Sequence, residues 1–214
     1  ADARASNITV KTPDINSSGV DFVPVVEGDN RVISFGLSAI RNVGEAVVSQ
    51  IVEYRRANGA FTSFYDFVDR APITTLNKRT VESLIKAGAS DSLGHPRKGL
   101  LLVFESIIEN TLNRRRERDQ GVMSLFDQGS DSSSSFSEQI EIPNINYEKS
   151  EQLKIEREAV RKEQDDASIK RMTLIEEEIE KIRAKITKEV EKGKKRFGDQ
   201  FNEAEFVATN PNVI

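Results

Sequence analysis

The sequence predicts a mainly α-helical protein with a small β region at its N-terminus. After residue 36, apolar residues recur at intervals of three and four in several segments, which is the spacing of one helix face. Alternating or continuous apolar runs of strand length are found instead in residues 7–35. A third segment, near the C-terminus, is rich in charge and lacks helix-breaking residues over several tens of positions.

The N-terminal runs predict three short strands, at residues 8–10, 21–25 and 31–35. Pro-Asp-Ile-Asn and Gly-Asp-Asn lie between these runs and are predicted to form turns. Because so few residues build only a small sheet, we expect it to pack on the rest of the chain.

Four helices are expected next, each with an apolar stripe whose ordinary role is core packing. Asn58-Gly59 ends the first of them, and an aromatic-rich segment beginning at Phe61 forms the second. The predicted helices cover residues 45–57, a short stretch that begins at about residue 61, residues 80–87 and residues 97–118.

Two glycine-containing turns lie among these helices, within Gly36–Glu45 and within Leu76–Gly94. A tight turn at a helix N-terminus exposes backbone N–H groups that a phosphate can accept. The pair therefore predicts a tandem helix-hairpin-helix that grips duplex backbone without reading bases. Solvated surface cations are the alternative explanation of the basic residues. The predicted contacts are the backbone near Asn42, Val43, Gly44 and Gly88, with charge from Arg41, Lys78, Arg79 and Lys86.

The charge distribution supports a nucleic-acid partner although the net charge is -4. Residues 36–118 hold 13 Lys and Arg against 9 Asp and Glu. Residues 129–214 hold 15 against 19, so the acidity lies in the C-terminal part of the chain.

Several kinds of chemistry are not predicted. The sequence has no cysteine, one histidine, no glycine-rich phosphate loop and no Ser/His/Asp set, so we expect no metal and no cofactor. Asp14 is the one tempting carboxylate, but two-metal catalysis needs at least two, and Pro13–Asn16 is predicted to be a turn. No window approaches about 18 consecutive apolar residues. We therefore expect no membrane partner and a cytoplasmic location.

The C-terminal part begins with a Ser-rich linker at residues 129–137. One long charged helix is expected over 147–196, with an irregular end after it. Its apolar residues Met172, Ile175, Ile179, Ile182 and Ile186 alternate spacings of three and four, which predicts a short coiled-coil seam, with Val190 off register. The predicted parts are thus residues 1–35, 36–118, 119–147 and 148–214.

Five segments occur in one order: Thr12–Ser17, Ile33–Glu45, Leu76–Arg79, Glu82–Ala89 and Asp91–Gly94. Together they resemble the alpha subunit of bacterial DNA polymerase III, a C-family replicative polymerase, at the end of its fingers region and in its helix-hairpin-helix and clamp-binding region. Leu153–Glu158 is similar to the segment before that family's OB-type domain. The resemblance covers roughly residues 8–158.

The resemblance implies partners and an activity. Duplex DNA, the sliding clamp and the rest of the polymerase core are the implied partners. The clamp motif falls at Met123, Ser124, Leu125 and Phe126. The family's catalytic aspartates belong to its palm, which this chain lacks, so DNA polymerisation describes the parent and no catalytic residue is assigned here.

The chain departs from the family pattern at four places. Asn42 replaces a usual Gly, and Asn tolerates a left-handed turn, so we expect the first hairpin to form. Ser90 replaces a usual Phe, which removes one core aromatic, and Val122 stands where the clamp motif opens with Gln. After Glu158 the charged segment replaces the family's continuation.

Two other functions are compatible with the sequence. A helix-hairpin-helix subunit of a repair complex would bind DNA without a polymerase parent. A coiled-coil scaffold would act through the C-terminal helix, and its dimers would dissociate when residues 160–214 are deleted.

Overall fold

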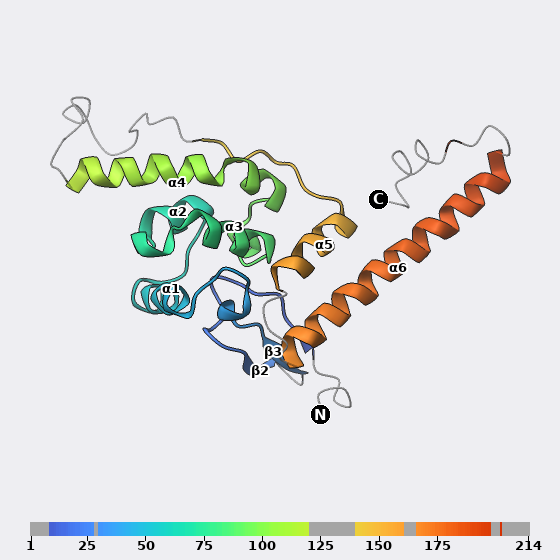
Figure 1. Ribbon diagram of the computed structural model, residues 1–214, viewed down its shortest axis with the longest axis horizontal. Coiled ribbons are helices and arrows are strands. Elements are labelled where there is room, and N and C mark those ends of the chain that lie inside the picture. Colours follow the sequence, from blue (N-terminus) through green and yellow to red (C-terminus); the bar gives the residue numbers. More distant parts are fainter. Residues whose placement is uncertain (1–8, 28–29, 120–139, 161–165, 198–201, 203–214) are drawn as a thin grey trace.

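The computed structural model describes residues 9–27, 30–119, 140–160, 166–197 and 202. The predicted clamp motif at Met123–Phe126, the Ser-rich linker and almost all of the predicted irregular end lie outside the described residues. The architecture is mainly helical with one small sheet (Figure 1). The fold class expected from the sequence is confirmed.

The sheet consists of β1 (Thr9–Val10), β2 (Val23–Glu27) and β3 (Asn30–Ser34) in the order β1-β3-β2. β1 is parallel to β3, and β2 is antiparallel to it with Val25 opposite Val32. Pro24 lies on β2, which pairs on one side alone within the described residues, where a residue without an N–H is tolerated. Val10 is buried in the core and its register partner Ile33 packs against that core, so the face of the sheet that carries these two residues joins it.

The helices follow in the predicted order, with boundaries moved by up to three residues. The second begins at Phe64 instead of Phe61 because the Ser63 hydroxyl caps it, accepting from the Asp66 amide at 3.1 Å. Asn77 caps the third helix in the same way. The elements are η1 (Leu37–Ala39), α1 (Glu45–Asn58), α2 (Phe64–Arg70), η2 (Ile73–Thr75), α3 (Lys78–Lys86), η3 (Asp91–Leu93) and α4 (Arg97–Asp119).

One core connects the sheet, the helices and the C-terminal elements. Phe61 meets Phe67 edge to face with ring centroids 5.2 Å apart, a favoured arrangement of two aromatic rings. The stripes expected to be buried are buried, including Val48, Ile51 and Val52 of α1. The apolar stripes therefore serve core packing, as predicted.

Residues 140–147 run without regular secondary structure beside α4 (Figure 1). The Gly99 amide donates to the Ile145 carbonyl at 3.1 Å, and the Tyr65 hydroxyl donates to the Ile140 carbonyl at 2.7 Å. A side chain at Gly99 would collide with the Pro143 carbonyl, so glycine is what lets this segment approach α4.

The C-terminal part differs from the prediction of one helix over 147–196. It forms α5 (Lys149–Ala159) and α6 (Asp166–Phe197), and Val160 is not helical. The reason is tertiary: Val160 is buried in the core, and the Ala159 carbonyl at the end of α5 accepts from the Arg41 amide at 2.9 Å. Both contacts stabilise a helix end that propensity alone does not predict.

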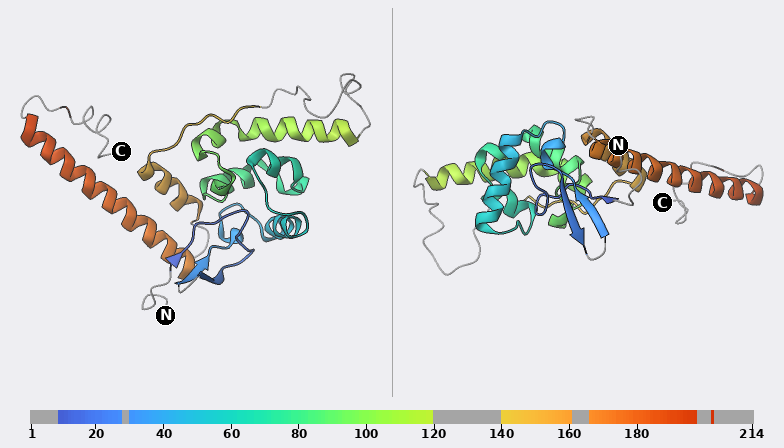
Figure 2. Two further views of the ribbon diagram at one scale, coloured as in Figure 1. Left: turned by 180° about the vertical axis from the view of Figure 1, so that it is seen from behind. Right: turned by 90° about the horizontal axis from the view of Figure 1, so that it is seen from below.

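The N-terminal part of the predicted seam packs within the chain. Ile175 and Ile179 belong to the core, and Met172 and Ile182 are partly buried against it. Further along, α6 extends away from the other described elements in all views (Figures 1 and 2). Across the described residues, none of the helices combines the length and apolar character needed to cross a bilayer.

Candidate nucleic-acid interface

The first hairpin joins η1 to α1 through a left-handed residue. Asn42 has φ 62°, and among the described non-glycine residues it alone has a positive φ. Its side-chain amide donates to the Ser83 hydroxyl at 3.3 Å, and the Thr80 hydroxyl donates to the Asn42 carbonyl at 3.2 Å. These two contacts hold the hairpin against α3. The expectation that Asn42 forms the turn is confirmed.

The start of α1 presents open N–H groups. Gly44, its N-cap, has no capping side chain, and Gly44, Glu45 and Ala46 are exposed. Within the described residues no acceptor receives the amides of these three residues, as the first turn of a helix leaves them. The Val43 amide differs from the prediction because it already donates to the Ile40 carbonyl at 3.2 Å, and Val43 is buried.

The second hairpin is closed by contacts within the chain. Gly88 has φ 85° and its amide donates to the Ile85 carbonyl at 3.0 Å. This amide is therefore bonded within the chain, whereas the sequence predicted that it would be open to a phosphate. The Ala89 carbonyl accepts from the Ile15 amide at 2.7 Å. Gly88 is buried, and the guanidinium of Arg97 occupies the space beside its Cα.

Arg97 carries a buried charge network over this hairpin. Its guanidinium forms ion pairs with Asp91 at 2.6 Å and with Glu156 of α5 at 3.3 Å, and Glu156 also pairs with Arg171 of α6. Burial alone would lower the pKa of Arg97, but hydrogen bonds and charges from Asp91 and Glu156 together raise it. The network thus joins the second hairpin to both C-terminal helices.

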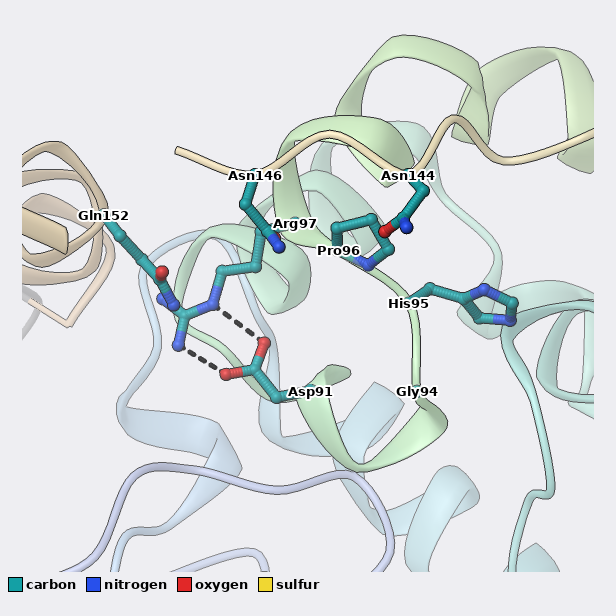
Figure 3. Close-up of a pocket in the computed structure, with 8 residues that line it drawn as sticks. All are labelled: Asp91, Gly94, His95, Pro96, Arg97, Asn144, Asn146 and Gln152. Carbon is teal, nitrogen blue, oxygen red and sulfur yellow. Dashed lines mark hydrogen bonds and ion pairs between the residues drawn. The ribbon is translucent and has the colours of Figure 1, made fainter. Parts of the chain in front are cut away.

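A polar pocket of about 290 Å³ lies beside this network (Figure 3). Asp91 and Arg97 face each other across two hydrogen bonds, and His95 points away from them (Figure 3). Because Asp91 and Glu156 already match the charge of Arg97, the pocket presents no unmatched guanidinium to a ligand. Its lining is Asp91, Gly94, His95, Pro96, Arg97, Asn144, Asn146 and Gln152.

The four predicted cations differ in their partners. Lys78 pairs with Glu105 at 2.9 Å and with Glu109 at 2.5 Å, and Lys86 pairs with Glu82 at 2.6 Å. Arg41 and Arg79 are exposed, and neither of them forms an ion pair with the described residues. Arg79, Ser83 and Lys86 are spaced by four and three, so they share the face of α3 that Asn42 contacts.

The Pro13–Asn16 segment forms a turn, as predicted. The Asp14 carboxylate accepts from the amides of Asn16 at 2.8 Å and Ser17 at 2.7 Å. Asn16 exchanges two hydrogen bonds with the Phe61 backbone. The Asp14 carboxylate thus stabilises the turn, and the described residues contain no cluster of acidic or histidine side chains suited to a metal.

The hairpins on either side of α3 define a helix-hairpin-helix module, and the family of the helix-hairpin-helix motif matches residues 7–100. The DNA polymerase III subunit alpha of Mycobacterium leprae is 41% identical over 158 residues, which are 74% of this chain and 13% of that protein. That of Thermus aquaticus is 44% identical over 125 residues, which are 58% of this chain and 10% of that protein. The resemblance to bacterial DNA polymerase III alpha subunits is confirmed.

This chain spans about a tenth to an eighth of the length of these relatives, since the Mycobacterium tuberculosis subunit is also covered to 13%. A second family matches the C-terminal part: residues 165–214 are similar to glycyl-tRNA synthetase insertion domain 1. The chain therefore combines a polymerase-type helix-hairpin-helix segment with a C-terminal segment similar to a different kind of protein.

Proposed function

We propose that this chain is the part of a replicative DNA polymerase alpha subunit that binds duplex backbone without base readout and tethers the enzyme to the sliding clamp in the cytoplasm. The observation that carries DNA binding is that three exposed amides at Gly44–Ala46, to which the described residues offer no acceptor, lie near the guanidinium groups of Arg41 and Arg79, which form no ion pair with those residues. Backbone amides and cations of this kind contact phosphates and carry no sequence information.

The first hairpin and the neighbouring face of α3 form the proposed contact surface. Asn42 holds the hairpin on α3 through Thr80 and Ser83, which keeps Arg41 and the start of α1 near Arg79. Lys86 and Lys78 add positive charge that their glutamate partners reduce. Glu45, in the first turn of α1, opposes an anion there, so we assign the main attraction to the two arginines.

The clamp contact rests on the resemblance. Leu125 and Phe126 are large apolar residues of the kind that a short peptide inserts into a partner's pocket. The remaining polymerase core is the other proposed partner. Similarity to DNA polymerase III alpha subunits over several motifs favours this function over a repair-complex subunit.

Binding of a fluorescent duplex by the whole chain, followed by anisotropy over a salt series, tests the DNA contact. Each neutralised phosphate contributes about 0.9 to the slope of log affinity against log salt. The double variant Arg41→Gln/Arg79→Gln is expected to reduce the slope by about 1.8. Lys78→Gln/Lys86→Gln removes the same charge and is the matched control; because carboxylates already pair with both lysines, its slope should fall by less than half as much.

Equal slopes for the arginine double variant and the unmodified chain would contradict the hairpin contact. For the clamp, surface plasmon resonance against a bacterial sliding clamp should show saturable binding that Leu125→Ala/Phe126→Ala abolishes. Binding that survives this double variant would place the clamp contact elsewhere.

A further inference from the structure

The charge of α6 is divided between its two halves. Residues 166–180 hold five acidic and two basic side chains, whereas residues 181–196 hold eight basic and two acidic ones. The helix thus changes from net negative to strongly positive along its length. Neither the helix-hairpin-helix segment nor the clamp motif includes this region.

Two acidic residues in the negative half of α6 form ion pairs with basic residues of α5. Lys149 of α5 pairs with Glu178 at 3.5 Å, and Arg157 pairs with Glu176 at 3.8 Å. Ile175, on the same half, is buried in the core. This half of the helix is therefore a docking element within the protein.

The positive half extends beyond those contacts (Figures 1 and 2). Five lysines follow one another at spacings of four and three, which places them on one face of a helix. All five are exposed. The lysine face consists of Lys181, Lys185, Lys188, Lys192 and Lys195.

Most of this charge has no partner in the described part of the chain. Lys192 pairs with Glu189 at 2.6 Å, and no ion pair is found there for the other four lysines. Like charges spaced by four on a helix destabilise it. A surface that concentrates them over about 21 Å, at 1.5 Å per residue, is suited to a ligand with closely spaced negative charge.

We propose that the lysine face of α6 binds the phosphate backbone of duplex DNA as a second site. Duplex DNA carries one phosphate per about 3.4 Å on each strand, so the 21 Å face covers the rise of about six phosphates. Such binding needs neither base contacts nor a pocket. The site does not depend on the proposed hairpin contact, because it lies on another element.

An acidic membrane is the other polyanion that lysines attract, and the helix is poorly arranged for it. An interfacial helix buries its apolar face in the lipid and carries its cations on the opposite, polar face. Here the apolar side of α6 is already used within the protein, because Val190 is buried and Ile182 is partly buried against the core. That side is therefore poorly available to a bilayer, whereas the exposed lysines can reach phosphates from solvent.

The test compares two double variants of the whole chain that remove the same charge from different faces of α6. Lys185→Gln/Lys188→Gln changes the lysine face, and Arg183→Gln/Lys194→Gln is the matched control. Anisotropy with a fluorescent duplex over 50–200 mM salt should show a slope reduced by about 1.8 for the first variant and by less than half of that for the control. Circular dichroism establishes that both variants keep their helix content.

Equal slopes for the two variants would overturn the proposal, because net charge and not the lysine face would then govern binding. Stronger binding to phosphatidylserine vesicles than to DNA, lost in the first variant, would also overturn it. Repeating the series in the Arg41→Gln/Arg79→Gln background separates the two sites. A lysine-face effect that persists there supports this site even if the hairpin contact fails.

Discussion

The guanidinium group of Arg97 fills the space in which a side chain at Gly88 would stand. Gly88 has φ 85°, and its turn is covered by a residue that pairs with Asp91 and Glu156. At Gly44 of the first hairpin, φ is -83°, and no atom of the described residues apart from the adjoining chain lies within 4 Å of an added Cβ. The two hairpin glycines therefore have different roles, one set by internal packing and the other by exposure.

Alanine substitution should separate these roles. Gly88→Ala combines a left-handed φ with a collision against Arg97, and we expect it to lower the free energy of unfolding by about 2–4 kcal/mol. Gly44→Ala should cost less than about 1 kcal/mol. Urea denaturation of both variants measures the difference. Similar losses would show that Arg97 moves aside without cost.

Removing the charge of Glu156 should destabilise the protein strongly. Glu156 is buried and pairs with both Arg97 and Arg171, so Glu156→Gln leaves two guanidinium groups short of a counter-charge. Breaking a buried pair on one side costs about 3–5 kcal/mol. Glu178→Gln is the control, since its pair with Lys149 is exposed and worth about 1 kcal/mol or less.

Local sequence signals predicted much of this fold. Helical spacing of apolar residues located α1, α3 and α4, and the tolerance of Asn for a left-handed turn anticipated the conformation of Asn42. The turn at Pro13–Asn16 was also predictable, because Asp14 satisfies neighbouring amides by itself. These features depend on residues close together in sequence.

The features that sequence patterns missed depend on distant partners. The break at Val160 follows from burial of that residue and from the bond between Arg41 and Ala159. Closure of the second hairpin requires Arg97, Glu156 and Arg171, which are 15 to 74 positions apart. The sequence did show Asp91 and Arg97 at the hairpin, but no local pattern indicated that Glu156 and Arg171 would join them.

Packing of the second hairpin also buries Ser90. Its hydroxyl is buried and has no hydrogen-bond partner among the described residues. Because a buried, unsatisfied hydroxyl costs about 1–3 kcal/mol, we expect Ser90→Ala to raise the free energy of unfolding by about 1 kcal/mol. Ser83→Ala is the contrasting variant, since the Ser83 hydroxyl accepts from Asn42 and its loss should destabilise. Stabilisation by both changes would contradict this difference.

His95 should make stability fall in mildly acidic solution. It is the one histidine of the chain, and its Nε2 is buried with no hydrogen-bond partner in the described structure. Burial disfavours the charged imidazolium and lowers the pKa of His95 below its ordinary value of about 6.5. A proton NMR titration of the single imidazole should therefore give a midpoint below that of a short peptide with the same residue.

The direction of the stability change follows from this lowered pKa. The unfolded chain takes up the histidine proton first as the pH falls, so this contribution is complete above the unfolded pKa and declines as the pH drops toward the folded one. Urea denaturation between pH 8 and about 5.5 avoids most carboxylate titration. His95→Gln should flatten the decline, and a variant that keeps the full pH dependence would assign it to other groups.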